Sequence, residues 1–497
     1  MSAPLSLSPA AALPAALPAV LSAVLPVVPF ARNAVPAAVA VTLPGSKSIT
    51  NRALILAALG TGVTRLEGAL FSRDTRVMCA ALRELGFGVE TDERARSITV
   101  TGTGGNIPRA RAALNVGNAG TAARFLTALL ALHPDGEFAL DGDVAMRGRP
   151  MRGLLDALRS QGTEAFAPDG APAVAFPFTL KTRGLRGGEI VVDASASSQI
   201  LSALLMVAPF ATSPATVCLR GETVSEPFVE MTRRMVAEMG SGKRGTGNGE
   251  EAQGEKTGEN IRRYAVEPDA TAGSYFLALP VAAPALTVLV RGLRETSAGG
   301  LQGDTEFAGV LRALGLDVRA TAEGFCAKAG TGGGINATGG APLVFDFNAI
   351  SDTFLTLAAL APLFPAPVTI RGVAHARRQE TDRLLGVARE LESLGQRVAP
   401  SAAALAADLA LGEITIFPDR AALLRAADNA TGSGGLAHIR TYDDHRFAMS
   451  FAILGCHDLR GDGSPWLAIE DPACCAKTFP DFFATLDSLR RPSRTRL

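Results

Sequence analysis

One pattern recurs along the chain and limits the folds that it can adopt. An amphipathic segment of the form LxxLxxLG is followed each time by a short stretch of β-forming residues, as in VMCAALRELGFGVE and FAGVLRALGLDV. Apolar residues at i, i+3, i+4 and i+7 ahead of a glycine predict a helix that ends at the glycine. Five copies close on glycines 75 to 80 residues apart, and a sixth copy, FPDFFATLDSL, lies near the end of the chain. The five glycines are Gly86, Gly162, Gly240, Gly315 and Gly395.

A second kind of helix alternates with the first. ITNRALILAALG, SSQILSALLMVAP and DDHRFAMSFAILG are three of its six copies, and each is apolar nearly all round after a polar first turn. A helix of this kind is buried on all sides. Strand-like segments such as SITVTG, LTVLVRG and EITIFP lie between the helices. The pattern therefore predicts an α/β protein built from six copies of a two-helix unit.

The length of the chain indicates more than one domain. At 497 residues it exceeds a typical single domain, so we expect two. Residues 240–263 carry almost no apolar side chain and are interpreted as a linker between the third and fourth repeats. We therefore expect one domain with repeats 1–3 at residues 45–267 and a second with repeats 4–6 at residues 268–497. A glycine-rich loop begins at Gly330, and residues 399–439 are interpreted as an irregular insertion.

The N-terminal residues 1–26 are interpreted as a low-complexity extension, mostly disordered. They are rich in Ala, Pro and Leu, and the first charge of the chain is Arg32. A secretory signal has a basic start and an apolar core without proline, whereas prolines interrupt this stretch repeatedly. The same prolines make it a poor membrane span. Only the chain after about Val27 is expected to enter the fold.

The balance of charge gives no sign of a nucleic-acid or membrane partner. The 48 Lys and Arg residues equal the 48 Asp and Glu residues, so an anion site must come from local clustering. A mean hydropathy of +0.21 is typical of a compact, core-rich protein. The six cysteines show no CxxC or Cys/His metal spacing, which favours reduced thiols in a cytoplasm.

The segment LPGSKSITNRA places a possible anion site at the start of a helix. Ser46 and Ser48 suit a helix N-terminus, where free N–H groups and the helix dipole would meet Lys47 and Arg52. Phosphate is a natural ligand for such a site. The alternative is an ordinary capped core helix with a surface lysine.

The other helix starts and the loops between helices carry further polar residues. Cations, hydroxyls and glycine-containing turns are what phosphate groups need, and carboxylates beside them suit proton transfer. Taken one by one, these residues also fit helix caps, surface ion pairs and core positions. NAGTA is no P-loop, and the sequence contains no Ser-His-Asp or zinc pattern. The residues are Asn118, Gly120, Thr121, Arg149, Ser197, Ser198, Gln199, Ser225, Asp352, Glu380, Arg383, Asp444, His445, Arg446 and Lys477.

Six motifs together resemble the EPSP synthase (3-phosphoshikimate 1-carboxyvinyltransferase) family. They are LPGSKSITNRA, NAGTAARFL, SASSQILSALLM, RRQETDR, YDDHRFAMSF and DPACCAKTFPDFF. The resemblance runs from about Val27 to Leu489. It implies transfer of the enolpyruvyl group of phosphoenolpyruvate to the 5-hydroxyl of shikimate 3-phosphate, with release of phosphate through a tetrahedral intermediate. It also implies an inside-out α/β barrel fold of two domains, each with three βαβαββ units, and residues 27–44 as a strand joining the C-terminal domain.

The resemblance assigns roles to individual residues. Asp352 would take the proton of the attacking hydroxyl, and Glu380 would protonate the methylene carbon, with Lys47 and His445 assisting. The residues implied for shikimate 3-phosphate are Lys47, Ser48, Arg52, Ser197, Ser198, Gln199, Ser225, Asp352, His375 and Gln379. Those implied for phosphoenolpyruvate are Lys47, Asn118, Gly120, Thr121, Arg149, Gln199, Arg383, Arg446 and Lys477.

The chain departs from the family pattern at three positions. Gln379 stands where a lysine commonly precedes the glutamate, and a glutamine cannot accept a proton usefully. His375 stands in place of a substrate-contacting asparagine, and Phe228 in place of a tyrosine. The neighbours Arg377 and Arg378 are candidates to restore the positive charge that Gln379 lacks.

Two alternatives remain beside this interpretation. UDP-N-acetylglucosamine enolpyruvyl transferases share the fold and donor, but they carry KN where this chain has Lys47-Ser48, and a catalytic cysteine that is missing near Arg149. A degenerate homologue that only binds is the second alternative, supported by Gln379 alone. The resemblance implies a cytoplasmic monomer with no metal or organic cofactor.

Overall fold

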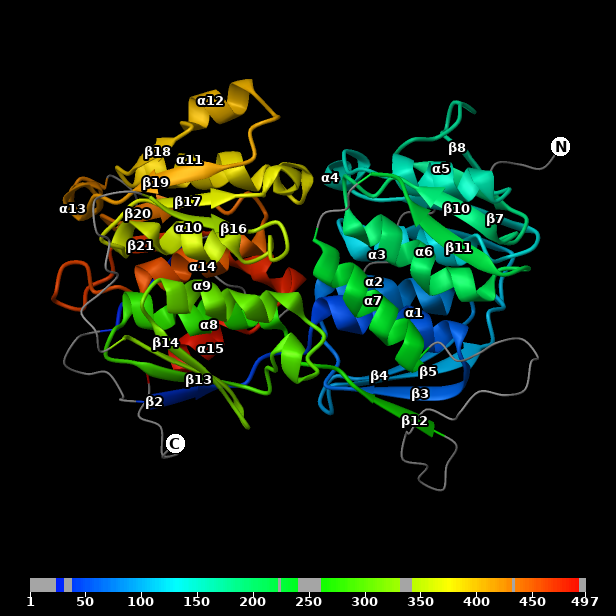
Figure 1. Cartoon of the computed structure of the whole chain (residues 1–497), viewed down its shortest axis with the longest axis horizontal. Coiled ribbons are helices and arrows are strands. Elements are labelled where there is room, and N and C mark those ends of the chain that lie inside the picture. Colours follow the sequence, from blue (N-terminus) through cyan, green and yellow to red (C-terminus); the bar gives the residue numbers. More distant parts are fainter. Residues whose placement is uncertain are drawn as a thin grey trace. The chain divides into compact units, whose positions relative to one another are not determined.

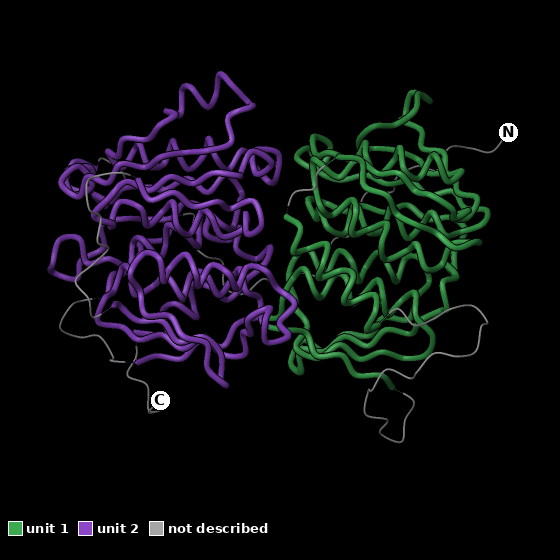
Figure 2. The backbone as a smooth tube through the Cα atoms, viewed as in Figure 1, with its two compact units in different colours: residues 1–16, 45–267 green, residues 17–44, 268–497 purple. Residues whose placement is uncertain are grey.

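The computed structural model describes residues 24–30, 38–221, 225–239, 261–330, 342–430 and 434–490. The linker interpreted at residues 240–263 and the glycine-rich loop after Gly330 fall mainly outside them. The chain divides into two compact units (Figure 2): unit 1 holds the described residues of Gly45–Glu267, and unit 2 those of Leu17–Pro44 and Pro268–Leu497.

Unit 1 contains three sheets. Two are four-stranded, with the orders β12-β3-β5-β4 and β6-β7-β9-β8, and the described residues of the third form the parallel pair β10-β11. In the second sheet β6 and β7 are parallel, whereas β9 is antiparallel to both β7 and β8. The strands are β3 (Thr61–Glu67), β4 (Gly88–Asp92), β5 (Ser97–Thr103), β6 (Arg111–Asn115), β7 (Gly136–Asp141), β8 (Glu164–Phe166), β9 (Phe178–Thr182), β10 (Gly188–Val192), β11 (Ala215–Leu219) and β12 (Ile261–Ala265).

Two classes of helix alternate in unit 1, as the sequence predicts. The apolar helices α1 (Lys47–Leu59), α3 (Gly120–Leu130) and α6 (Ser198–Val207) are buried along most of their length, and α3 packs against both others. The amphipathic helices α2 (Arg73–Glu84), α5 (Arg152–Ser160) and α7 (Glu226–Met239) each keep one exposed face. Short helices are α4 (Val144–Arg147) and η1 (Ala208–Phe210).

Unit 2 repeats this construction. Its sheets have the orders β14-β15-β13-β2, β16-β17-β19-β18 and β1-β21-β20. The strands are β1 (Val24–Pro26), β2 (Ala38–Val41), β13 (Thr287–Arg291), β14 (Asp317–Thr321), β15 (Gly324–Lys328), β16 (Leu343–Asp346), β17 (Val368–Arg371), β18 (Arg397–Ala399), β19 (Ile414–Phe417), β20 (Ala437–Ile439) and β21 (Leu467–Glu470).

The helices of unit 2 fall into the same two classes (Figure 1). The apolar helices α8 (Ala270–Ala282), α10 (Phe354–Leu360) and α14 (His445–Gly455) pack against one another. The second class comprises α9 (Phe307–Ala313), α11 (Arg383–Ser393) and α15 (Phe482–Ser488). Shorter elements are α12 (Ala402–Ala407), α13 (Arg420–Asp428), η2 (Thr296–Ala298), η3 (Gly303–Glu306), η4 (Ala361–Leu363), η5 (Ala374–Arg378) and η6 (Pro472–Lys477).

The βαβαββ unit is visible in the order of the elements. The series β6, α3, β7, α5, β8, β9 in unit 1 and the series β16, α10, β17, α11, β18, β19 in unit 2 follow it, with short helices inserted between some of their members. The first repeat of each unit takes one strand from a distant segment: β12 pairs with β3, and β2 pairs with β13. Figure 1 shows both pairings as green beside blue.

Two details differ from the sequence interpretation. Val24–Pro26 form β1 and pair with β21, although the sequence assigned them to the extension. Alternation of apolar residues over three strand positions is too short a signal to detect. Residues 399–439 are no irregular insertion, because their described part contains β19 as the strand between β17 and β18.

No helix among the described residues is both long and apolar enough to cross a membrane. All six cysteines lie in the described ranges, and all are free thiols.

Candidate functional site

In unit 1, the start of α1 lies where the sequence predicts it. The Ser46 side chain caps the helix by accepting a hydrogen bond from the Ile49 N–H at 3.4 Å. Gly45 is required just ahead of it, because a Cβ there would lie 2.0 Å from the carbonyl oxygen of Gly68. The first helical residue is Lys47, and its Nζ lies 3.9 Å from Oδ2 of the buried Asp74 on α2. Asp74 thus limits where the ammonium group can lie.

Arg52, one turn further along α1, is enclosed by neutral groups. Only 1% of the residue is exposed. Its guanidinium donates to Oγ1 of Thr232 at 2.7 Å, to Oγ of Ser202 at 3.1 Å and to the carbonyls of Ser48 and Phe228 at 3.0 and 3.2 Å.

Two aromatic rings cover the same guanidinium, those of Phe125 at 5.2 Å and Phe228 at 5.9 Å. Burial lowers the pKa of Arg52 to about 9. Among the described residues no carboxylate forms an ion pair with it. Arg52 is therefore a buried cation that has only neutral hydrogen-bond partners among the described residues.

The serine-rich start of α6 lies about one helical turn before Ser202, to which Arg52 donates. Ser197 caps α6 by accepting from the Gln199 N–H at 3.3 Å, and Ser198 is buried at 6% exposure. Oε1 of Gln199 is buried without a hydrogen-bond partner among the described residues. Ser225 precedes α7 and holds a left-handed backbone with φ 52°. Arg52 joins these segments, because it binds Ser202 on α6 and the carbonyl of Phe228 on α7.

The NAGTA segment forms the start of α3, and Arg149 lies directly upon it. Nη1 of Arg149 lies 3.4 Å from Oδ1 of Asn118. A Cβ on Gly120 would lie 2.5 Å from the same Nη1, so only glycine permits this approach. Thr121 is buried in the first turn of α3, whose N–H groups add positive potential beside the guanidinium.

In unit 2, Arg383 is the centre of a network of charges. It begins α11 and is 1% exposed. Nε donates to Oδ2 of Asp444 at 2.7 Å, and Nη2 donates to Oδ1 of Asp444 at 3.3 Å and to Oε2 of Glu380 at 2.9 Å. Nη1 donates to Oδ1 of Asp352 at 3.2 Å and to Oε1 of Gln379. All five N–H groups of the guanidinium are therefore used.

Two further cations extend the network. Nζ of the fully buried Lys477 lies 3.0 Å from Oε1 of Glu380. Nη2 of Arg446 lies 2.6 Å from Oδ2 of Asp352. Burial lowers the pKa of Arg446, but the nearby anionic groups, Asp352 first among them, together outweigh burial and the net pKa is raised. We name this group the unit 2 charge cluster; its members are Asp352, Glu380, Arg383, Asp444, Arg446 and Lys477.

Burial and the charges of the cluster shift the pKa values of two neighbouring side chains. Burial lowers the pKa of His375, with Asp352 opposing this effect and Arg383 adding to it. Burial and then the charge of Asp352 raise the pKa of Asp304 to about 7. Asp304 Oδ2 accepts a hydrogen bond from the Thr271 hydroxyl, whereas its Oδ1 has no hydrogen-bond partner among the described residues.

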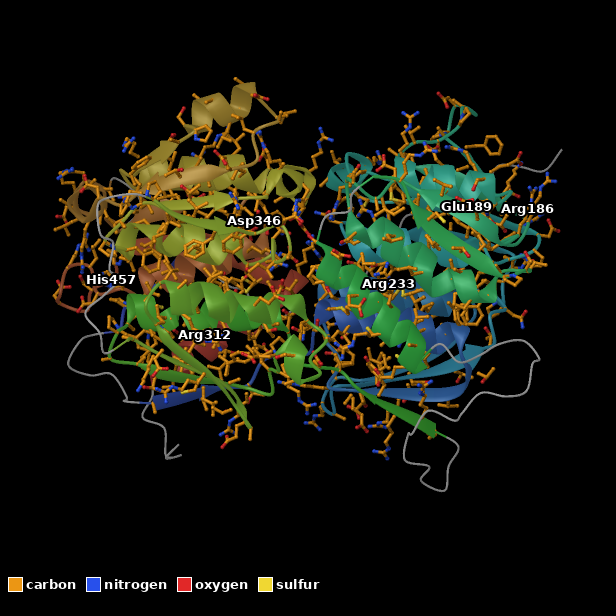
Figure 3. The ribbon with its side chains drawn as sticks, in the orientation of Figure 1. Arg186, Glu189, Arg233, Arg312, Asp346 and His457 are labelled. Atoms are coloured by element: carbon orange, nitrogen blue, oxygen red, sulfur yellow. The ribbon has the colours of Figure 1, made fainter. Side chains whose placement is uncertain are left out.

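Two buried histidines lie at opposite ends of α14, and their surroundings differ. His445 begins the helix, fully buried, with Nδ1 3.5 Å from Oδ1 of Asp444. His457 follows the other end of the helix (Figure 3), where its ring contacts the Ala282 carbonyl at 2.9 Å and Nη2 of Arg420 at 2.7 Å. Only His445 lies with the predicted site residues.

The suggestion that Arg377 restores a missing charge is wrong. Its guanidinium donates to Oδ2 of Asp382 at 2.8 Å and to the carbonyl of Leu405 at 2.6 Å, so its donors are directed into the structure around α12. Arg378 is exposed and forms no part of the cluster's described contacts. The cluster takes its cations from Arg383, Arg446 and Lys477 instead.

Most of the predicted site residues come together within each unit. Two buried carboxylates pair with predicted cations but were assigned no substrate or catalytic role from the sequence: Asp74, which pairs with Lys47, and Asp444, which pairs with Arg383. Asp444 stands directly before His445 and caps α14 through the Arg446 N–H at 3.0 Å, a capping pattern that the sequence shows. Within the described ranges no group of three or more His, Cys, Asp or Glu side chains suits a metal ion.

Comparison with known proteins gives consistent matches over nearly the whole chain. Residues 33–486 match the model of the family described as EPSP synthase (3-phosphoshikimate 1-carboxyvinyltransferase). The 3-phosphoshikimate 1-carboxyvinyltransferase of Opitutus terrae is 48% identical over 473 residues, which cover 94% of this chain and 98% of the relative. That of Nostoc punctiforme is 37% identical, covering 90% and 95%.

Two solved structures resemble the fold. The EPSP synthase from Acinetobacter baumannii has a TM-score of 0.67 at 21% identity and covers 94% of this chain and 98% of its own. The enolpyruvyl transferase NikO from Streptomyces tendae has a TM-score of 0.65 at 16% identity and covers 94% and 97%. The fold is therefore that of the enolpyruvyl transferases.

Proposed function

This chain belongs to the EPSP synthase family, and we propose that it transfers the enolpyruvyl group of phosphoenolpyruvate to the 5-hydroxyl of shikimate 3-phosphate, releasing phosphate. The observation that supports this assignment is the unit 2 charge cluster, in which carboxylates and cations alternate at distances of 2.6 to 3.3 Å. The reaction needs cations for the donor's phosphate and carboxylate, and carboxylates for two proton transfers. The cluster contains both.

The transfer is an addition followed by an elimination. In the addition, the 5-oxygen bonds to C2 of phosphoenolpyruvate, the hydroxyl proton leaves and C3 gains a proton. In the elimination, C3 gives up a proton and the bond between C2 and the phosphate oxygen breaks. We assign the hydroxyl proton to Asp352 and the exchange at C3 to Glu380, with Lys47 and His445 assisting.

The charges of the cluster explain how Glu380 could become an acid when the donor binds. In the described contacts its carboxylate lies between Lys477 and Arg383, at 3.0 and 2.9 Å, which favours the ionised form. Phosphoenolpyruvate brings a phosphate and a carboxylate that compete for the same cations. Its binding therefore weakens their hold on Glu380 and favours the protonated carboxyl group that C3 requires.

Cations are the common feature of the phosphoenolpyruvate residues. A planar guanidinium suits a phosphate or a carboxylate because it donates two parallel hydrogen bonds. At the start of α3, the guanidinium of Arg149 and the free backbone N–H groups of the helix could bind the same anion. The residues that we assign to phosphoenolpyruvate are Lys47, Asn118, Gly120, Thr121, Arg149, Gln199, Arg383, Arg446 and Lys477.

Hydroxyl and amide groups are the common feature of the shikimate 3-phosphate residues of unit 1. Oε1 of Gln199 lacks a hydrogen-bond partner among the described residues, and a ring hydroxyl would supply a donor. Arg52 is covered by neutral groups, so its charge attracts an anion at the α6 start while its hydrogen bonds hold α6 and α7. The residues that we assign to this substrate are Lys47, Ser48, Arg52, Ser197, Ser198, Gln199, Ser225, Asp352, His375 and Gln379.

We further propose a cytoplasmic monomer that acts on small molecules only. Equal numbers of acidic and basic residues support the absence of nucleic-acid and membrane partners. Static light scattering of the purified chain would test the monomer, and a mass of twice 51.3 kDa would contradict it.

Phosphate release tests the proposed reaction directly. Purified protein receives phosphoenolpyruvate with shikimate 3-phosphate in one arm and with UDP-N-acetylglucosamine in a parallel arm. We expect release only with shikimate 3-phosphate. Release only with the nucleotide sugar would assign the other enolpyruvyl transfer, and binding of shikimate 3-phosphate without release would identify a protein that binds but does not catalyse.

A further inference from the structure

Gln379 occupies a particular place in the hydrogen bonding of Arg383. The guanidinium has five N–H donors and five acceptors, and four of these acceptors are oxygens of Asp352, Glu380 and Asp444. The fifth is Oε1 of Gln379, which is neutral. It shares Nη1 with Asp352, so these two residues jointly set the position of that nitrogen.

The charge of the cluster explains why a neutral acceptor fits. The ion pairs link three cations, Arg383, Arg446 and Lys477, with three carboxylates. A lysine at position 379 would add a fourth cation beside Arg383 and offer no acceptor. A glutamate would keep the acceptor but add a fourth carboxylate. Of these three side chains, only glutamine both supplies the oxygen and keeps the charges of the described ion pairs balanced.

Loss of this oxygen would act on Asp352. If Oε1 of Gln379 is removed, one N–H on Nη1 of Arg383 is left without its acceptor. Asp352 is the other acceptor on that nitrogen, at 3.2 Å, and it already accepts from Arg446 at 2.6 Å. A guanidinium that turns further toward Asp352 makes its carboxylate a weaker base.

We propose that Gln379 is a positioning residue, whose side-chain oxygen holds Arg383 so that Asp352 stays available to take the proton of the attacking hydroxyl. This inference rests on the proposed function, because it concerns the base of that reaction. The proposal also gives Gln379 a role different from that of the basic side chain that the family commonly has at this position.

Three substitutions separate the acceptor from the charge. Gln379→Met removes the acceptor and stays neutral, Gln379→Glu keeps the acceptor, and Gln379→Lys removes it and adds a cation. We expect kcat to fall about tenfold for Gln379→Met and further for Gln379→Lys, with KM for phosphoenolpyruvate changed less than about threefold. Gln379→Glu should retain more kcat than Gln379→Met.

A control distinguishes positioning from stability. Gln396 is buried in the same unit, where its side chain bonds to the backbone of Asp419 at 2.9 and 3.0 Å. Gln396→Met should lower the melting temperature but leave kcat and its pH profile as in the wild type. Wild-type kcat and pH profile in Gln379→Met, or in Gln379→Lys, would overturn the proposal.

A crystal structure of Gln379→Met gives a readout that does not depend on turnover. We expect Nη1 of Arg383 to move relative to Oδ1 of Asp352 from its separation of 3.2 Å. An unchanged guanidinium would overturn the proposal even if kcat had fallen. If the wild type releases no phosphate with shikimate 3-phosphate, the proposed function fails, while this structure still decides whether Gln379 positions Arg383.

Discussion

Two buried arginines, one in each unit, have opposite surroundings. Arg52 and Arg383 are both 1% exposed and both use most of their N–H donors inside the protein. Arg52 donates to hydroxyls and carbonyls and lies against two phenylalanine rings. Arg383 donates to three carboxylates and one amide. Within the described part of the chain, the same side chain therefore has no carboxylate partner in unit 1 and three carboxylate partners in unit 2.

Their acid–base behaviour follows from these contacts. Burial lowers the pKa of Arg52 to about 9, and no carboxylate among the described residues pairs with it to oppose this effect. Burial also lowers the pKa of Arg383, but Asp444 and Glu380 outweigh it and the net pKa is raised. Unit 1 is therefore suited to attracting an anion. Unit 2 is suited to exchanging protons, since an arriving anion redistributes charges that are already balanced.

The first way to test this contrast is Glu380→Gln, for which we expect the largest effect. The glutamine side chain has the size of glutamate and retains a weaker hydrogen bond to Lys477. It cannot exchange a proton with C3. We expect turnover to fall about 10²- to 10⁴-fold, the usual range for a general acid. The affinity for shikimate 3-phosphate, measured by calorimetry, should stay within about threefold of the wild type, because most of the residues that we assign to this substrate belong to unit 1.

Glu306→Gln is the matched control, because Glu306 is exposed on η3 and forms no ion pair among the described residues. It should leave turnover unchanged. If Glu380→Gln lost binding and turnover together, Glu380 would be a structural member of the cluster and no acid.

Replacing each arginine by methionine tests the contrast itself. Arg383→Met leaves three carboxylates without their central cation, and breaking a buried network of this kind costs about 3–5 kcal/mol. Arg52→Met removes a cation from neutral acceptors that can bond to one another, since the Thr232 hydroxyl already donates to Ser202 at 2.9 Å. We expect its stability to change by less than about 1 kcal/mol.

Thermal unfolding measures both variants, and about 1 kcal/mol corresponds to roughly 2–4 °C in a unit of this size. Calorimetry should show that Arg52→Met weakens shikimate 3-phosphate binding about tenfold or more, because the anion loses its positive field. Equal loss of stability in both variants would contradict the contrast between the two arginines.

Periodicity predicted the fold well. The six apolar helix patterns predicted six helices buried on all sides, and α1, α3, α6, α8, α10 and α14 are buried along most of their length. Strand exchange is different, because the residue pattern of Ala38–Val41 and Ile261–Ala265 does not show that each pairs with a strand far away in sequence. Only the family resemblance implied such a pairing, and only for residues 27–44. Partners at that separation are decided by packing of the whole unit.

The site was predictable in its residue types and less so in its pairings. Lys47, Glu380 and Arg383 stand out as charged residues at helix starts. Their buried partners Asp74 and Asp444 resemble ordinary helix caps in the sequence, so the sequence does not distinguish a cap from an ion-pair partner. The enclosure of Arg52 by neutral groups depends on Ser202 and Thr232. In the sequence these two residues lie inside predicted helices, and nothing marks them as partners of an arginine.

The smallest of the three effects concerns Asp304, a fourth carboxyl group beside a cluster whose charges are already balanced. Burial and the charge of Asp352 raise its pKa from 3.8 in the unfolded chain to about 7. Below pH 3.8 Asp304 is protonated in both the folded and the unfolded chain. Above about pH 7 it is ionised in both, and the folded chain is then destabilised by the full free energy of a buried carboxylate next to Asp352. The folded state binds more protons in between, so stability from this group falls as the pH rises through that window.

Asp304→Asn removes this dependence while its amide oxygen can still accept from the Thr271 hydroxyl. Compared with the wild type, the variant should gain about 2–3 kcal/mol between pH 5 and pH 8, seen as a melting temperature that rises relative to the wild type. A difference that stays constant over this range would mean that Asp304 is ionised throughout. The cluster would then carry an excess carboxylate, and the balance that sets unit 2 apart from unit 1 would not hold.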